Sequence, residues 1–225
     1  MTIWQGAYGR DIRRMTTTRQ RMRTKPTFEI ENEYPNMIVA GTDEAGRGPL
    51  SGPVVAAAVI MPRHMHIDSI INDSKQMTKK AREASYKWIT ENATWAIGMC
   101  AAEEIDEINI LRASMRAMGQ AIHKLSTKPD FVLVDGNKVP DEITNGRAVV
   151  KGDAKSISIA AASIVAKVTR DRIMTELAKE FPEYDWDKNA GYPTKKHFEA
   201  LAKYGPTPHH RKTFNLTPPI CHTAA

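Results

Sequence analysis

The stretch Met37–Pro49 reads MIVAGTDEAGRGP and joins an apolar run, two acidic residues and a glycine-rich turn. The run over residues 37–42 predicts a β-strand, and Asp43 and Glu44 follow it directly. Carboxylates at a strand end suit a hard cation such as Mg²⁺, because that ion prefers oxygen ligands. The amides of the turn suit an anion such as phosphate. A solvated strand end with an ordinary turn has the same composition, so this stretch alone leaves both interpretations open.

The positive charge of the chain is concentrated at its N-terminus. The net charge is +6, and residues 1–26 hold seven Arg or Lys against one acid, which also amounts to +6. The remaining residues, 27–225, are formally neutral, so a nucleic-acid surface there must be a local patch. We expect residues 1–36 to form a disordered, dispensable basic arm or an upstream extension before a later start. Their composition also loosely resembles an organelle transit peptide.

The composition predicts a cytoplasmic protein. A chain of 225 residues with 41% hydrophobic content can bury the core of one domain with a small appendage. Cys100 and Cys221 have neither metal-ligand spacing nor a disulfide framework, which fits a reducing compartment. No apolar run approaches the roughly 20 residues that span a bilayer.

Apolar runs and their periodicity predict a mixed α/β domain. Strands are expected at 37–42, 54–61, 94–101, 131–134 and 148–150, and helices at 81–92, 105–125 and 156–179. In the middle helix, seven apolar residues recur at steps of three and four, which is typical of an amphipathic face. Three early strands, followed by alternating helices and strands, predict a mixed sheet covered by helices.

Three acidic sites follow apolar runs, namely Asp43-Glu44, Asp135 and Asp153. Residues beyond the strand ends of an open α/β sheet form its usual ligand crevice, so neighbouring strands would bring four carboxylates together. Asp135-Gly136 is also a common turn dipeptide, and Asp153 also has the position of a helix N-cap. A cluster of carboxylates repels itself unless cations neutralise it. Oxygen-only ligands suit two Mg²⁺ or Mn²⁺ ions, an arrangement used for phosphodiester cleavage.

Seven motifs, in order along the chain, resemble those of the ribonuclease HII family and cover about residues 37–215. They are TDEAGRGPLSGPVV at 42–55, NDSK at 72–75, VDGN at 134–137, KGDAK at 151–155, AASIVAKVTRD at 161–171, GYPT at 191–194 and HRKTF at 210–214. The resemblance implies the ribonuclease H-like α/β fold, a five-stranded mixed sheet whose first three strands are antiparallel, flanked by helices. It also implies a catalytic domain over residues 37–180 and a helical C-terminal extension over 181–225 that completes the substrate groove.

The activity that this resemblance implies is metal-dependent endonucleolytic hydrolysis. The substrates are the RNA strand of RNA/DNA hybrids and single ribonucleotides embedded in duplex DNA, which are cut on their 5′ side to leave 3′-hydroxyl and 5′-phosphate ends. Such incision belongs to ribonucleotide excision repair. We expect a monomeric enzyme with a two-metal mechanism, and no membrane partner.

The family motifs also imply site residues. Asp43, Glu44, Asp135 and Asp153 match the metal-binding catalytic carboxylates. The loop Gly46-Arg47-Gly48 matches the one that contacts the 2′-hydroxyl and a nearby phosphate, and Tyr192 matches the tyrosine that stacks on the next sugar. Candidate phosphate contacts are Lys75, Lys151, Lys155, Lys167, Arg170, Lys195, Lys196 and Arg211, each of which could equally be a solvated surface residue. For Asp171 we expect a salt bridge. For His209 and His210 we expect a structural or surface position, with assistance in proton transfer as the alternative.

Two other functions fit parts of this pattern. Another two-metal nuclease of the superfamily, such as a type 1 ribonuclease H or a junction resolvase, would ignore a single embedded ribonucleotide. A catalytically silent nucleic-acid-binding protein would bind a duplex without cutting it. A pure binder has no use for clustered carboxylates beside phosphates, which argues against the second alternative.

Overall fold

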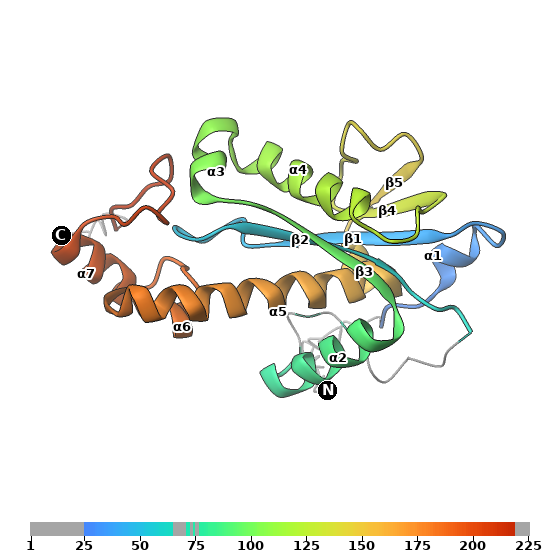
Figure 1. Cartoon of the computed structure of the whole chain (residues 1–225), viewed down its shortest axis with the longest axis horizontal. Coiled ribbons are helices and arrows are strands. Elements are labelled where there is room, and N and C mark those ends of the chain that lie inside the picture. The colour runs from blue at the N-terminus through green and yellow to red at the C-terminus, as the bar shows by residue number, and fades with distance from the viewer. Residues whose placement is uncertain (1–24, 65–70, 73, 75–76, 219–225) are drawn as a thin grey trace, which may run out of the picture.

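The computed structural model describes residues 25–64, 71, 72, 74 and 77–218, and its centre is a five-stranded mixed sheet (Figure 1). The strands are β1 (Val39–Ala45), β2 (Val54–Ile60), β3 (Thr94–Cys100), β4 (Phe131–Asp135) and β5 (Gly146–Val149). Their order is β3-β2-β1-β4-β5, with β1, β2 and β3 antiparallel and β4 parallel to both β1 and β5. The predicted fold class is therefore confirmed.

Helices cover both faces of the sheet (Figure 1). Helices α3 (Ala102–Ile108) and α4 (Ile110–His123) lie on one face, and α5 (Ile157–Glu180) with α2 (Lys79–Asn92) lies on the other. Alternate residues of β2 enter the two cores, since Ala56 and Ala58 pack toward α4 while Ala57 and Val59 pack toward α5. This explains why β2 is a continuous apolar run rather than an alternating one.

The long helix α5 lies unusually close to β1. A β-carbon added to Gly41 of β1 would lie 2.2 Å from the Ser158 carbonyl carbon, which no real structure tolerates. Small residues at the start of α5, Ala160, Ala161 and Ala162, are fully buried against the sheet. Asp43, two residues after Gly41 on the same face of β1, is thereby brought against α5, where Ser163 forms a hydrogen bond with it.

Two predicted elements differ in the structure. The helix expected at 105–125 is divided into α3 and α4 at Asn109, which has a φ of +67° and whose side chain accepts hydrogen bonds from the amides of Leu111 and Arg112. The apolar face continues across the break, so periodicity did not reveal it. Strand β1 extends to Ala45, so Asp43 and Glu44 lie within the strand rather than after it.

The segment before β1 is folded, contrary to the expectation of a disordered arm up to residue 36. It contains the short helix α1 (Glu29–Asn32), and Thr27 forms a parallel bridge with Ser156. Tyr34 stacks on Phe131 with ring centroids 4.1 Å apart. Basic charge was the wrong criterion here, because the cationic residues stop at Lys25 and an acidic, aromatic segment follows. Residues 1–24 lie outside the described part of the chain.

Glu31 anchors this segment to the start of α5. Its side chain is 1% exposed, and its Oε1 accepts hydrogen bonds from the Ser156 hydroxyl at 2.7 Å and the Ser158 amide at 2.9 Å. Free amides at a helix N-terminus favour a negative charge, so this carboxylate stabilises the first turn of α5.

The C-terminal part packs at the end of the sheet where β1 leads into the glycine-rich loop (Figure 1). It contains short helical turns at Pro182–Tyr184 (η2) and Trp186–Asn189 (α6), then α7 (Lys195–Tyr204). Trp186 is fully buried at its centre. Ser51 forms an antiparallel bridge with His210, which joins this part to the loop between β1 and β2. None of the described helices has the length and apolar character needed to cross a membrane.

Candidate active site

The acidic residues of β1 lie beside the acidic end of β4. Thr42 pairs with Val134 in parallel register, so Asp43 and Asp135 are the next residues on neighbouring strands. Asp43 is 4% exposed, and its pKa is raised well above the ordinary value, chiefly by burial and further by the charges of Glu44 and Asp135. A hydrogen bond from Ser163 of α5 opposes this rise. Carboxylates that repel each other in a buried place are the expected signature of a cation site.

Ser163 and Ser74 are site residues that sequence analysis missed. The two hydroxyl oxygens lie 2.9 Å apart, and Ser163 also bonds Asp43. Because Ser163 donates its proton to the carboxylate, Ser74 is the donor to Ser163. Both serines lie inside family motifs, which is the signal that could have indicated them.

Glu44 shares its carboxylate with the glycine-rich loop. Arg47 Nη1 lies 3.2 Å from Glu44 Oε1, and the Arg47 side chain is 52% exposed. Burial raises the pKa of Glu44, while the adjacent Arg47 charge opposes the increase. The guanidinium therefore balances one negative charge of the cluster and still faces solvent.

Asp153 is held close to Asp135 by a tight turn, η1 (Gly152–Ala154). The Gly152 amide donates a 2.6 Å hydrogen bond to Asp135 Oδ1. A β-carbon at Gly152 would lie 2.5 Å from Ile159 Cδ1 and 3.2 Å from that same oxygen, so the close approach requires glycine. Asp153 is 5% exposed but does not cap α5, because Ser156 fills that role by accepting from the Ile159 amide. The N-cap alternative for Asp153 is therefore excluded.

The carboxylate oxygens fit a hard divalent cation in their chemistry and charge. Asp43, Glu44 and Asp135 interact electrostatically, and Asp153 is tied to them through the turn at Gly152. Within the described residues, however, no three His, Cys, Asp or Glu side chains are already arranged to hold one ion. The assignment of all four carboxylates as metal ligands therefore stays a prediction.

Arg211, a predicted candidate for phosphate contact, instead organises the glycine-rich loop from within. It is fully buried, and its guanidinium donates to backbone carbonyls on both sides of the turn. These bonds run to the carbonyls of Gly46 (2.6 Å), Arg47 (3.1 Å), Pro49 (2.8 Å) and Gly52 (2.9 and 3.1 Å). Burial, followed by the charge of Arg170, lowers the pKa of Arg211 to about 9. The loop conformation thus depends on a residue far away in sequence.

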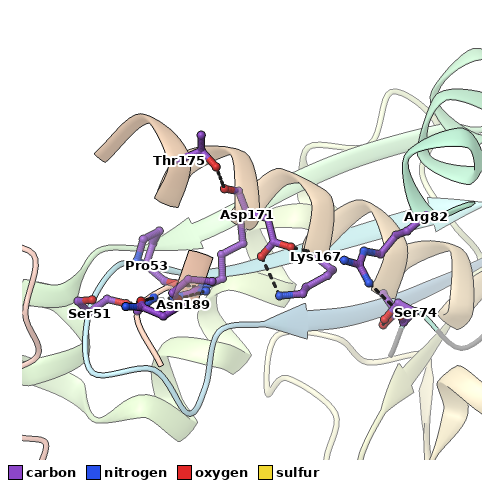
Figure 2. A network of polar contacts seen from close by, with 12 residues as sticks. Ser51, Pro53, Ser74, Arg82, Lys167, Asp171, Thr175 and Asn189 are labelled. Carbon is purple, nitrogen blue, oxygen red and sulfur yellow. Dashed lines mark hydrogen bonds and ion pairs between the residues drawn. The ribbon is translucent and has the colours of Figure 1, made fainter. Parts of the chain in front are cut away.

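Arg170 is likewise internal, so its predicted contact with phosphate is wrong. It is 1% exposed and donates to the carbonyls of Ser51, Pro53 and Ala190 at 2.9–3.0 Å. Two of these acceptor residues, Ser51 and Pro53, are labelled in Figure 2. A β-carbon at Gly46, whose φ is +98°, would lie 2.1 Å from Arg170 Nε, so glycine is required there. A sequence signal existed, because Arg170 continues the buried four-residue spacing of α5 that includes Met174.

Tyr192 lies beside the glycine-rich loop although more than 140 residues separate them. Its side chain is 43% exposed, and a β-carbon built on Gly48 would lie 3.7 Å from Tyr192 Cε1. Lys167 Nζ lies 6.0 Å from the centroid of the tyrosine ring. The loop, the ring and this lysine therefore form one accessible surface next to the carboxylates.

The remaining predicted basic residues have different surroundings. Lys167 forms the expected ion pair with Asp171 at 2.7 Å, and Arg82 lies 3.8 Å from the same carboxylate while also binding the Ser74 carbonyl (Figure 2). Lys151 and Lys155 are exposed on either side of the turn that carries Asp153. Lys75 lies outside the described residues.

Comparisons with known proteins agree with this geometry. The Ribonuclease HII family model matches residues 40–217. The ribonuclease HII of Rickettsia bellii (strain OSU 85-389) is 54% identical over 189 residues, covering 83% of this chain and 94% of that relative. Ribonuclease HII of Ehrlichia chaffeensis is 52% identical over 196 residues, covering 84% of this chain and 94% of that relative.

Solved structures give the same result. The crystal structure of ribonuclease H2 from Pyrococcus horikoshii OT3 superposes with a TM-score of 0.66 at 30% identity, covering 79% of this chain and 94% of that one. The ribonuclease HII of Archaeoglobus fulgidus, solved in complex with PCNA, has a TM-score of 0.66 at 25% identity, covering 82% and 98%.

The sheet topology, the acidic strand ends and these neighbours define an enzyme of the ribonuclease H class. Within that class, the chain belongs to the ribonuclease HII family. It is accordingly an endoribonuclease, a metal-dependent hydrolase that acts on RNA/DNA hybrids.

Proposed function

We propose that this enzyme incises duplex DNA on the 5′ side of a single embedded ribonucleotide, in addition to cutting RNA/DNA hybrids, and leaves 3′-hydroxyl and 5′-phosphate ends. The observation that carries the proposal is the position of the exposed Tyr192 ring against Gly48, in a loop that begins two residues after Glu44. The carboxylates are then contiguous with the surface formed by the Gly46–Gly48 loop and Tyr192, which we call the sugar-reading surface.

Recognition of one ribonucleotide requires contacts with its 2′-hydroxyl, the group that distinguishes RNA from DNA. Backbone amides of the Gly46–Gly48 loop would supply fixed donors for it. A site built to bond a hydroxyl discriminates strongly against the deoxy sugar, because its own polar groups are then left unpaired. The Tyr192 ring, stacked on the following sugar, would exclude a second 2′-hydroxyl and so favour an RNA-to-DNA step.

In the catalytic step, Asp43, Glu44, Asp135 and Asp153 would provide oxygen ligands for two Mg²⁺ or Mn²⁺ ions. When bound, such a pair activates a water molecule and stabilises the leaving oxygen. Arg47 would orient Glu44 and approach a phosphate with its exposed side. Lys151, Lys155 and Lys167 would contact neighbouring phosphates and make binding sensitive to salt.

The test is an incision assay on three matched duplexes with Mg²⁺ or Mn²⁺: all DNA, DNA with one ribonucleotide, and a continuous hybrid. We expect cleavage of the last two only, with the product ends mapped by ligation and by phosphatase treatment. Cleavage of the hybrid without cleavage at the single ribonucleotide would refute the proposal and favour a type 1 ribonuclease H activity. A protein that binds all three and cuts none would be the silent binder.

We also propose that the enzyme is monomeric and cytoplasmic. The buried, unpaired thiol of Cys100 supports a reducing compartment. Light scattering at micromolar concentration should then give a mass near 25.1 kDa, whereas twice that mass would contradict the monomer.

A further inference from the structure

Two buried histidines link the backbone of Tyr192 to the segment that carries Arg211. His197 of α7 and His210 are 0% and 1% exposed, and their Nε2 atoms lie 3.0 Å apart. The other ring nitrogen of His197 lies 3.0 Å from the Tyr192 carbonyl oxygen, and that of His210 lies 2.9 Å from the Thr207 amide. Four groups thus form a continuous chain of hydrogen bonds that ends at Tyr192.

The surrounding donors determine where each proton resides. The Thr207 amide can only donate, so His210 Nδ1 accepts and a neutral His210 carries its proton on Nε2. The Trp186 indole also can only donate, and it reaches His197 Nε2 at 3.3 Å. His197 Nε2 is therefore an acceptor for both Trp186 and His210, and its own proton lies on Nδ1, directed at the Tyr192 carbonyl. Both rings are neutral at physiological pH, because burial lowers their pKa values, that of His210 to about 4.

The same region also fixes the loop. His210 is followed by Arg211, whose guanidinium binds four carbonyls of residues 46–52. The Leu50 amide donates to the Gly191 carbonyl, one residue before Tyr192. Arg211 therefore binds the glycine-rich loop directly, and the adjacent His210 reaches Tyr192 through His197.

We propose that the His210–His197 hydrogen-bond relay is a positioning device for Tyr192, which makes these two histidines specificity-determining residues for the RNA-to-DNA step. The inference rests on the proposed function, because it assumes that Tyr192 meets the sugar. Neither histidine contacts the reacting atoms. They act by holding the Tyr192 backbone at a fixed distance from Gly48, so that the ring occupies one place beside the loop.

Two substitutions at His197 separate this role from general packing. The Asn amide reaches about as far as the imidazole Nδ1, so His197→Asn retains the donor to Tyr192 and loses the acceptor for His210. The Gln amide reaches about as far as Nε2, so His197→Gln retains the bond with His210 and loses the donor to Tyr192. If His197 had only a structural role, both substitutions would change the activity on the two substrates by similar amounts, since each leaves one polar partner unsatisfied.

The measurement is the ratio of kcat/KM on the single-ribonucleotide duplex to kcat/KM on the continuous hybrid. We expect His197→Gln to lower this ratio by about tenfold, the value of one buried hydrogen bond, and His197→Asn to keep it within about threefold of the wild type. In a Tyr192→Ala background, His197→Gln should have no further effect on the ratio. Equal ratios for Gln and Asn, or a full additional effect without the ring, would overturn the proposal.

A measurement on the unmodified chain tests the relay even if a variant does not fold. Nitrogen NMR shifts of the imidazole rings should place the His197 proton on Nδ1 and the His210 proton on Nε2 at neutral pH. The opposite tautomers would overturn the relay. If the wild type does not incise a single ribonucleotide at all, the proposed function fails while the tautomers remain as assigned, so the two failures are distinguishable.

Discussion

Replacement of Arg211 by lysine should weaken both the stability of the protein and its recognition of a ribonucleotide. The guanidinium makes five hydrogen bonds to four backbone carbonyls, and those of Gly46, Pro49 and Gly52 are buried. A lysine ammonium has three donors, so at least one carbonyl loses its partner. A buried acceptor left unsatisfied costs about 1–3 kcal/mol, which corresponds to a melting temperature lower by roughly 2–12 °C in a chain of this length.

The assay combines thermal unfolding, followed by circular dichroism, with the incision assay on both substrates. Because the lost bonds lie under residues 46–52, we expect activity on the single ribonucleotide to fall more than activity on the hybrid. The matched control is Arg172→Lys, which changes an exposed arginine that pairs with Glu83 at 2.7 Å and lies 4.4 Å from the centroid of the Tyr86 ring. Arg172→Lys should lower the free energy of unfolding by less than about 1 kcal/mol. Equal, small effects of the two substitutions would refute the assignment of Arg211 as the organiser of the loop.

Three further predictions follow from the site and its supports. Asp43→Asn should abolish cleavage, keep duplex binding and raise the metal-free melting temperature, because it removes a buried charge whose raised pKa reflects burial and neighbouring carboxylates. Mg²⁺ or Mn²⁺ at about 100 times its Kd should stabilise the wild type by about 2.7 kcal/mol and leave that variant unchanged, and a similar stabilisation of both would contradict metal binding at this residue. Burial lowers the pKa of His210 to about 4, so its contribution to stability is complete above the unfolded-state pKa near 6.5 and is lost as the pH falls toward 4. In denaturant titrations, His210→Gln should therefore reduce the dependence of the free energy of unfolding on pH between these values. An unchanged pH dependence would count against the lowered pKa of His210. Deletion of residues 1–24 should leave the melting temperature unchanged, whereas deletion of 1–34 should lower it because the buried contacts of Glu31 are removed, and equal melting temperatures would contradict this.

Local patterns in the sequence indicated most of the sheet and its acidic ends. The strands at residues 54–61 and 94–101 and the helix at 156–179 agree with β2, β3 and α5 to within a residue at either end. Such elements are encoded by neighbours in the chain, since hydrophobic period and length distinguish strands from helices. Reliance on hydrophobic period also explains why one helix was predicted at 105–125. The apolar face continues through the break at Asn109, so the period does not reveal it.

Arginines show the limit of sequence reasoning most clearly. Residues such as Arg170 and Arg211 have the composition of surface phosphate ligands, yet both are buried and bind carbonyls. The helical spacing of α5 indicates burial for Arg170, but nothing in the local sequence of Arg211 distinguishes the two outcomes, because burial of a charge depends on whether distant backbone oxygens are available to solvate it.

The sequence by itself determined the family, the sheet and the identity of the acidic residues, because these depend on short motifs and on local periodicity. Only the tertiary structure decided how the glycine-rich loop is held and which ring stands beside it. Arg211 is separated from the Gly46 carbonyl that it binds by 165 residues, and Tyr192 approaches Gly48 across a comparable gap. Contacts of that range arise when the C-terminal part packs on the end of β1, and no pattern within a window of neighbouring residues contains them.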